Sequence, residues 1–262
     1  MLSEYQNLVS SPLLPDDLKA LLTSRTPDNN LGIALVDKSQ LLNGHETEFI
    51  SSWLTDEEHL QLDRYSFDKR RKEWLLGRIC AKQSALDLLK TRNGANILTP
   101  LEISIGINPS GRPFLEVGEN MSTTTQPDIS ISHSHDKAIA IAAHAHCGVD
   151  IQLLTDTLFK VKDRYCTESE AALLDSTSED ELVQLGMLWV AKESVKKCLS
   201  AFSHIGFLAI HLEAIRLHQN YRLLDFLIDE PYSGAGTVTV ITHIHDRYAL
   251  AVCTIPKERI HA

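Results

Sequence analysis

The stretch EDELVQLGMLWVAKESVKKCL, residues 179–199, predicts a long helix, and it is followed by the strand-like runs HLEAIRL, YRLLDFLI, GTVTVIT and YALAVCT. Its second half, WVAKESVKK, places Trp189, Glu193 and Lys196 at i, i+4 and i+7, so an aromatic ring, an acid and a base share one helix face. Two interpretations fit this mixed face. It is either a solvated surface on which Glu193 pairs with Lys197 at i+4, or part of a functional site.

The first half of the chain has the same order of elements. Apolar residues keep helical spacing from Arg71 to Lys90, and Asn93-Gly94 supplies a stop signal. The run LGIALV (31–36) predicts a strand before this helix. Strand-like runs follow at LEISIGI, RPFLEV, DISIS, KAIAIAA and GVDIQ. Each half therefore has a strand, a long helix and several further strands.

A short internal repeat supports two similar halves. HSHDKAIAI (133–141) and HIHDRYALAV (243–252) share H-x-H-D-[K/R] before an apolar strand, with a gap of one residue. We predict an α+β fold of two similar α+β halves. The expected division is an N-terminal extension at 1–30, an N-terminal half at 31–145 and a C-terminal half at 146–262.

Composition limits the class of protein. Hydrophobic residues make up 43% of the 262 residues and charged residues 23%, as in soluble globular proteins. The formal net charge of -10 disfavours general binding of nucleic acid. We see no signal peptide or membrane span, and the five widely spaced cysteines include no CxxC pair. We expect a cytoplasmic protein that binds neither nucleic acid nor membrane.

The pentamer GVDIQ (148–152) carries two oxygen-bearing side chains on one strand face. Asp150 and Gln152 alternate along the predicted strand and so project to the same side. Oxygen ligands that include one or two carboxylates suit Mg²⁺. The alternative is that Asp150 is a turn residue at the end of the strand.

Three HxH pairs offer a zinc alternative. A site like that of the metallo-β-lactamases would need H-x-H-x-D-H, whereas Asp136 follows His135 directly and no further histidine comes next. A metallohydrolase is therefore the weaker interpretation of these pairs, which are His133/His135, His144/His146 and His243/His245.

The segment DKRRK (68–72) places cations at the start of a predicted helix, where the helix dipole disfavours them. An anion that docks at this end would explain the arrangement, and Arg78 returns to the face of Arg71 seven residues later. The alternative is a solvated basic helix end that nearby acids neutralise.

In chain order, DKRRKEWLLGRICAKQSAL, GRPFL, ISHS, GVDIQ and WVAKESVKK resemble the Sfp-type 4′-phosphopantetheinyl transferases. The last two resemble that family's strongest signature, G-[I/V]-D-[I/x]-[E/x] followed by W-x-x-K-E-[S/A]-x-x-K. The resemblance covers roughly Arg64 to Leu199. It implies two α+β halves related by a pseudo-twofold axis.

The activity that the resemblance implies is the Mg²⁺-dependent transfer of the 4′-phosphopantetheine arm of coenzyme A to a serine of an apo acyl or peptidyl carrier protein. Adenosine 3′,5′-bisphosphate would be released. Such carriers serve fatty-acid, polyketide or nonribosomal-peptide biosynthesis. We expect a monomer, because the family's longer form has both halves in one chain.

The resemblance also implies the residues of the site. Asp150, Gln152 and Glu193 match the metal-binding positions, although many relatives have Glu where this chain has Gln152. Glu193 matches the residue proposed to take the serine proton. Lys196 matches a lysine that contacts phosphate, and Lys192 matches another lysine of the same motif, with a less defined role in binding the coenzyme.

In the first half, the resemblance implies six further coenzyme-binding positions: Arg70 and Arg78 for the nucleotide 3′-phosphate, Gly111 and Arg112 in the adenine-side loop, and Ser132 and His133 for the other phosphates. A second interpretation of the whole set is a non-catalytic module that binds coenzyme A or a carrier protein. Such a binder would have no need of the metal carboxylates, which makes the transferase the preferred hypothesis.

Overall fold

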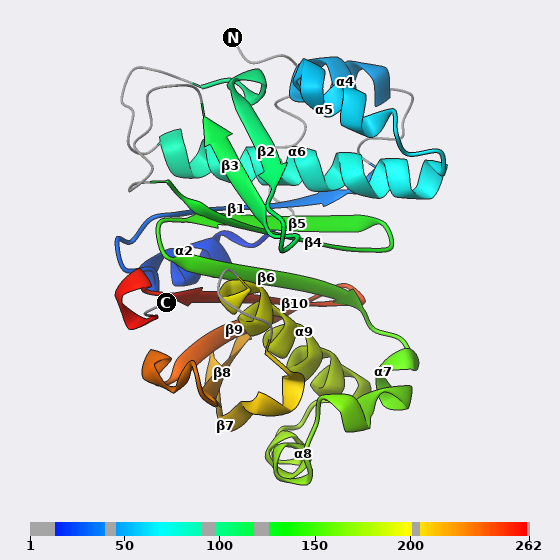
Figure 1. Cartoon of the computed structure of the whole chain (residues 1–262). Coiled ribbons are helices and arrows are strands. Elements are labelled where there is room, and N and C mark those ends of the chain that lie inside the picture. Colours follow the sequence, from blue (N-terminus) through cyan, green and yellow to red (C-terminus); the bar gives the residue numbers. More distant parts are fainter. Residues whose placement is uncertain (1–13, 40–45, 91–97, 118–125, 201–204, 261–262) are drawn as a thin grey trace. The chain divides into compact units, whose positions relative to one another are not determined.

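The computed structural model describes residues 14–39, 46–90, 98–117, 126–200 and 205–260. The chain has a mixed α+β fold and divides into two compact units, unit 1 (residues 1–144) and unit 2 (residues 145–262) (Figure 1). Across the described ranges, no helix has both the length and the apolar character needed to cross a membrane.

Unit 1 packs one long helix, α6, against a three-stranded antiparallel sheet of order β1-β5-β4. Figure 1 shows α6 running alongside β1 and β5. A separate antiparallel hairpin is formed by β2 and β3. The elements of unit 1 are α2 (Asp16–Ser24), β1 (Leu31–Asp37), α4 (Glu46–Trp53), α5 (Asp56–Leu62), α6 (Asp68–Lys90), β2 (Ile103–Ile107), β3 (Pro113–Val117), β4 (Asp128–Ser134) and β5 (Lys137–Ala143).

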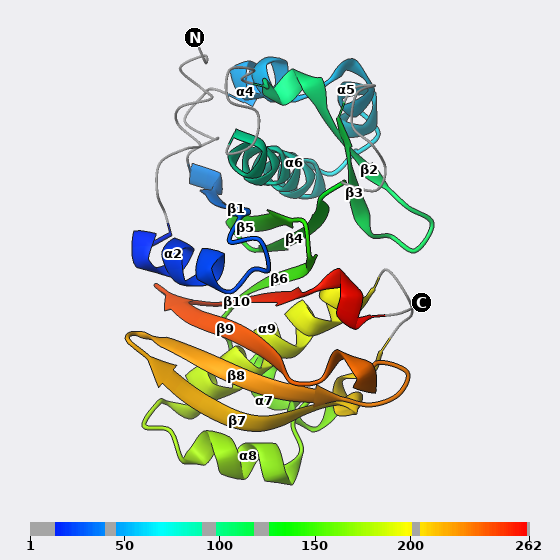
Figure 2. The ribbon, with the colours of Figure 1, turned by 90° about the vertical axis from the view of Figure 1, so that its left-hand side faces the viewer.

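Unit 2 packs its long helix, α9, against one face of a five-stranded antiparallel sheet of order β6-β10-β9-β8-β7 (Figure 2). The elements of unit 2 are β6 (His146–Leu153), α7 (Thr157–Lys160), α8 (Glu168–Asp175), α9 (Glu181–Leu199), β7 (Ile210–His218), β8 (Tyr221–Ile228), β9 (Val238–His245) and β10 (Tyr248–Ile255).

Hydrophobic periodicity predicted the main elements correctly. Every predicted strand is present, and both long helices are confirmed. Helix α6 begins at Asp68, before the predicted Arg71, and ends at Lys90. The predicted stop signal at Asn93-Gly94 lies outside the described residues. The sequence analysis missed α4, α5 and α7, which have 8, 7 and 4 residues and so offer little periodicity.

Each long helix touches its sheet at a glycine. A Cβ atom added to Gly148 on β6 would lie 1.9 Å from the carbonyl oxygen of Ser194 on α9. A Cβ added to Gly32 on β1 would lie 1.8 Å from the carbonyl oxygen of Ser84 on α6. Only glycine permits so close an approach of helix backbone to strand backbone. The two contacts therefore define corresponding positions in the two units.

A buried lysine and glutamate form the second feature that both units share. In unit 2, Nζ of Lys192 lies 2.7 Å from Oε1 of Glu170, and neither side chain is more than 2% exposed. In unit 1, Lys82 and Glu58 form the corresponding pair, with the same burial. Each glutamate is the third residue of a short helix and completes its capping box, with Thr167 or Thr55 as the N-cap residue.

The repeated H-x-H-D segments occupy corresponding hairpin turns. One joins β4 to β5 and the other joins β9 to β10. The residue with positive φ is His135 (55°) in the first turn and Asp246 (53°) in the second. This shift of one position accounts for the gap in the sequence repeat.

We predict that Gly148→Ala lowers the free energy of unfolding by about 3 kcal/mol, because the new methyl group would overlap the backbone of α9 and force it away from β6. Gly206→Ala is the matched control, since a Cβ there meets nothing within 4 Å. Urea unfolding of both variants measures the difference. Equal stabilities would show that the close approach is not needed.

Candidate functional site

The first candidate residue, Asp150, lies inside strand β6 of unit 2. It pairs with Ala251 in the ladder, and β6 continues to Leu153, so the turn-residue alternative is wrong. Its carboxylate is 8% exposed and accepts a hydrogen bond from Nζ of Lys197 at 2.6 Å. Nζ of Lys197 also donates to the carbonyl oxygen of Val149 at 3.0 Å. The structure thus pairs a buried carboxylate with a partly exposed lysine.

The second candidate, Glu193, lies on α9 and pairs with Lys196. The distance between Nζ and Oε1 is 3.4 Å, and the two side chains are 28% and 23% exposed. Nζ of Lys196 also lies 3.8 Å from the ring centroid of Phe207, within the range of a cation–π interaction. Each carboxylate of the predicted metal site therefore has its own lysine.

The structure draws attention to Lys197, which the sequence analysis named only as a possible partner of Glu193. Counted from Trp189, the motif W-x-x-K-E-[S/A]-x-x-K ends on Lys197, whereas we matched its last lysine to Lys196. Lys197 is also the residue whose ammonium group reaches Asp150. The spacing of the motif was the available signal. By this count, the motif lysine expected to contact phosphate is Lys197. Lys196 is the preceding residue and pairs with Glu193.

The third expected metal ligand, Gln152, follows Asp150 by two positions on β6. Its Nε2 donates to the carbonyl oxygen of Leu153 at 2.9 Å, so Oε1 is the atom that could ligate a metal. Two carboxylates and one amide oxygen suit Mg²⁺, which prefers hard oxygen ligands and keeps several waters or phosphates. These donor types are therefore ones that Mg²⁺ accepts.

The three HxH pairs of the zinc alternative can be compared with the grouping of side chains in the structure. In the described parts of the chain, no group of three or more His, Cys, Asp or Glu side chains is placed to hold a metal ion. All three HxH pairs lie within these parts. The arrangement of these histidines therefore gives the metallohydrolase alternative no support.

The expected coenzyme-binding residue Lys192 lies in the interior of unit 2. Besides its ion pair with Glu170, its ammonium group donates to the carbonyl oxygen of Phe207 at 3.2 Å. Burial lowers the pKa of Lys192, and the carboxylate of Glu170 opposes this effect. Because Lys192 is fully buried and held by protein groups, the geometry supports a structural role rather than a contact with coenzyme.

In unit 1, Arg78 on α6 is a buried cation with unused donors. The residue is 4% exposed, and neither Nε nor Nη2 finds a hydrogen-bond partner among the described residues. Its guanidinium lies 4.6 Å from the ring centroid of Trp74. Burial lowers the pKa of Arg78, which reflects the cost of a charge in the interior. Such a group is suited to an anion that enters from outside.

The other cations at the start of α6 are neutralised by acids, as the solvated alternative predicted. Arg70 is 67% exposed and lies 3.5 Å from Glu73. The neighbouring pairs are Arg71 with Glu46 and Asp63, and Lys72 with Asp68. Within this group, Arg78 is thus the residue with buried donors that find no hydrogen-bond partner in the described part of the chain.

The remaining expected residues of unit 1 lie on the hairpin and on β4. Gly111 has a φ of 83° in the turn between β2 and β3. Arg112 is buried, and its Nε donates to Asp128 at 3.2 Å, so its guanidinium already has a protein partner. On β4, His133 is exposed, whereas Ser132 is buried on the other face.

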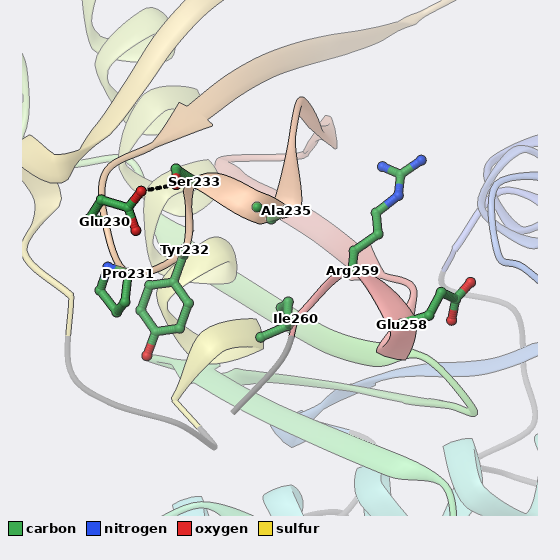
Figure 3. Close-up of a pocket in the computed structure, with 9 residues that line it drawn as sticks. Glu230, Pro231, Tyr232, Ser233, Ala235, Glu258, Arg259 and Ile260 are labelled. Carbon is green, nitrogen blue, oxygen red and sulfur yellow. Dashed lines mark hydrogen bonds between the residues drawn. The ribbon is translucent and has the colours of Figure 1, made fainter.

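A pocket of about 450 Å³ in unit 2 contains none of the predicted site residues. Its charged lining residues are Glu230, Glu258 and Arg259, which give it a net negative charge and make it unsuitable for phosphate. In Figure 3 the side chains of Glu258 and Arg259 point away from Tyr232.

Comparisons with known proteins give one family match, which lies within unit 2. Residues 146–253 match the model of the 4′-phosphopantetheinyl transferase superfamily. This match runs from β6 into β10 and includes Asp150, Gln152 and Glu193. No curated protein sequence matches the chain.

Solved structures with similarity to part of the chain include holo-acyl-carrier-protein synthases. The enzyme from Bacillus anthracis, in complex with CoA (3′,5′-ADP), is 24% identical over 43% of this chain and 92% of its own, with a TM-score of 0.36. The enzyme from Neisseria meningitidis is 20% identical over 43% and 94%, with a TM-score of 0.36. The enzyme from Helicobacter pylori, in complex with coenzyme A, is 20% identical over 43% and 97%, with a TM-score of 0.35.

We predict that Lys192→Met lowers the free energy of unfolding by about 3–5 kcal/mol, because it leaves the buried carboxylate of Glu170 without its counterion. The folded fraction should bind coenzyme A with unchanged affinity. Lys160→Met, at an exposed position on α7, should alter neither property. Calorimetric titration with coenzyme A below the melting temperature separates a structural role from a role in binding. A large loss of affinity in folded Lys192→Met protein would show that Lys192 contacts the coenzyme.

Proposed function

We propose that this chain is an Sfp-type 4′-phosphopantetheinyl transferase that modifies a serine of an apo acyl or peptidyl carrier protein. The observation that carries the proposal is the buried Asp150, which is held by the last lysine of the helix motif, inside the segment that matches the superfamily model. We further expect a cytoplasmic monomer and two halves related by a pseudo-twofold axis.

The site residues suit phosphoryl transfer from coenzyme A. Asp150, Glu193 and Gln152 would hold Mg²⁺, which supplies positive charge against the pyrophosphate when bound. Glu193 is partly exposed and can accept the proton of the attacking serine hydroxyl. Lys197 and Lys196 provide cations for the charge on the phosphate oxygens. Adenosine 3′,5′-bisphosphate is the leaving group.

Arg78 is the residue that we assign to the nucleotide 3′-phosphate. Its buried Nε and Nη2 donors have no partner in the described part of unit 1, and a phosphate accepts hydrogen bonds in the geometry that a guanidinium offers. We expect Arg70, Gly111 and Arg112 to contribute less to coenzyme binding. Arg70 is exposed, Gly111 has no side chain to contact a phosphate, and Arg112 already pairs with Asp128. Ser132 and His133 remain proposed contacts for the other phosphates.

The reaction can be tested directly by intact-mass analysis. Several apo carrier proteins are incubated with the protein, coenzyme A and Mg²⁺, with Glu193→Gln as the matched variant that keeps the side-chain size. We expect one phosphopantetheine to be added by the wild-type protein and none, or at least a hundredfold less, by the variant. If coenzyme A binds and no carrier is modified, the chain is the non-catalytic binding module.

We predict that Arg78→Gln weakens coenzyme A binding by about tenfold or more and leaves the affinity for 3′-dephospho-coenzyme A unchanged, because the two ligands differ by the phosphate assigned to Arg78. Arg216→Gln is the control, since its guanidinium is 49% exposed and pairs with Asp225 in unit 2. Calorimetric titration of each protein with both ligands gives the comparison. An equal loss for both ligands would assign Arg78 to another part of the coenzyme.

A further inference from the structure

We propose that Lys197 is an internal counterion that holds Asp150 in place of the metal, and that a divalent cation must displace it in order to bind. This inference rests on the proposed metal site and adds to it a residue that opposes metal binding. Its support comes from the contacts of Lys197 and from a comparison of the two units.

The geometry identifies Asp150 as the main partner of the lysine. Nζ lies 2.6 Å from Oδ1 of Asp150, a short charge-assisted hydrogen bond. The carboxylate is only 8% exposed, so it would carry a large desolvation cost without a cation beside it. In the protein without a metal ion, the ammonium group of Lys197 supplies that positive charge.

The lysine is able to leave. Its side chain is 28% exposed, unlike Lys192, which is fully buried. A long flexible side chain at the surface of the helix can move its ammonium group into solvent at modest cost. Lys197 can therefore give up Asp150 to a metal ion without leaving a buried charge behind.

Unit 1 provides an internal comparison. The Gly32–Ser84 contact of unit 1 corresponds to the Gly148–Ser194 contact of unit 2. Asp150 lies two positions after Gly148, and the residue two positions after Gly32 is Ala34. Lys197 lies three positions after Ser194, and the residue three positions after Ser84 is Asp87. Asp87 accepts a hydrogen bond from Gln83 at 2.8 Å, and Ala34 is buried. The buried Lys–Glu pair is present in both units, but the Lys–Asp pair is specific to unit 2. The fold therefore does not require Lys197 and Asp150, which points to a function for them.

Displacement links metal binding to the charge of the site. A divalent cation on Asp150 would release the ammonium group of Lys197, which is then free to contact an incoming phosphate. Until this exchange takes place, the lysine weakens metal binding in two ways. It occupies the carboxylate, and it places a like charge next to the cation.

The test measures Mn²⁺ binding to the full chain by electron paramagnetic resonance, without coenzyme or carrier. We expect Lys197→Met to bind Mn²⁺ about tenfold or more tightly than the wild type. We expect Lys197→Arg, which keeps the charge, to bind close to the wild-type value. Lys162→Met is the control, because Lys162 is also a partly exposed lysine of unit 2 with an acid partner, Glu181, at 3.0 Å.

A second readout covers the case in which Lys197→Met is unstable. Its melting temperature without metal should fall, and Mn²⁺ should raise it more than in the wild type, because the ion replaces the missing counterion. Unchanged or weaker Mn²⁺ binding in Lys197→Met overturns the inference. Carrier modification by the wild type in the same preparations would show that the proposed function survives such a result. A tenfold gain in Mn²⁺ affinity for Lys197→Met, with no carrier modified by the wild type, would support the inference and contradict the proposed function.

Discussion

The buried ion pair between Lys192 and Glu170 constrains how the elements of unit 2 pack, because neither charge can be left in the interior without the other. Glu170 caps its own helix and also accepts the backbone N–H of Leu212 at 2.9 Å. Lys192 reaches from the middle of α9 to this carboxylate and to the carbonyl oxygen of Phe207. One pair therefore joins α8, α9 and the start of β7. Every polar atom that it places in the interior finds a partner, as a buried charge requires.

The same solution in unit 1 shows which features belong to the fold. Lys82 donates to the carbonyl oxygens of Trp53 and Pro100, and its partner Glu58 accepts the N–H of Ile105 at 3.1 Å. This arrangement resembles the network of unit 2, where the glutamate also accepts a strand N–H and the lysine also donates to a carbonyl oxygen. The contact between glycine and helix is repeated as well. The carboxylates and lysines of the proposed site, on α9 and β6, are not repeated at the corresponding positions of unit 1. The comparison of the two units thus distinguishes the charged residues that belong to the fold from those of the proposed site.

The sequence predicted the strands because each is a short apolar or alternating run between turn residues. It predicted both long helices because helix-compatible residues continue well beyond the length of a strand, without proline. It also identified Asp150 and Glu193 as metal-binding candidates through a motif. It could not place Lys192, because the interior ion pair depends on Glu170, which lies on a different helix 22 positions earlier. Nor could periodicity reveal that Arg78 is buried without partners, since the packing around α6 decides this. The phosphate role was matched to Lys196, whereas the motif counted from Trp189 ends on Lys197, the lysine that contacts Asp150.

The most direct test of the account is a crystal structure of the protein with Mn²⁺ and coenzyme A, in which anomalous scattering locates the metal ion. The account predicts Mn²⁺ bound by oxygen atoms of Asp150 and Glu193, with the ammonium group of Lys197 moved away from Asp150 and Arg78 in contact with a phosphate. Mn²⁺ at another position, or Lys197 still paired with Asp150 beside a bound coenzyme, would contradict it.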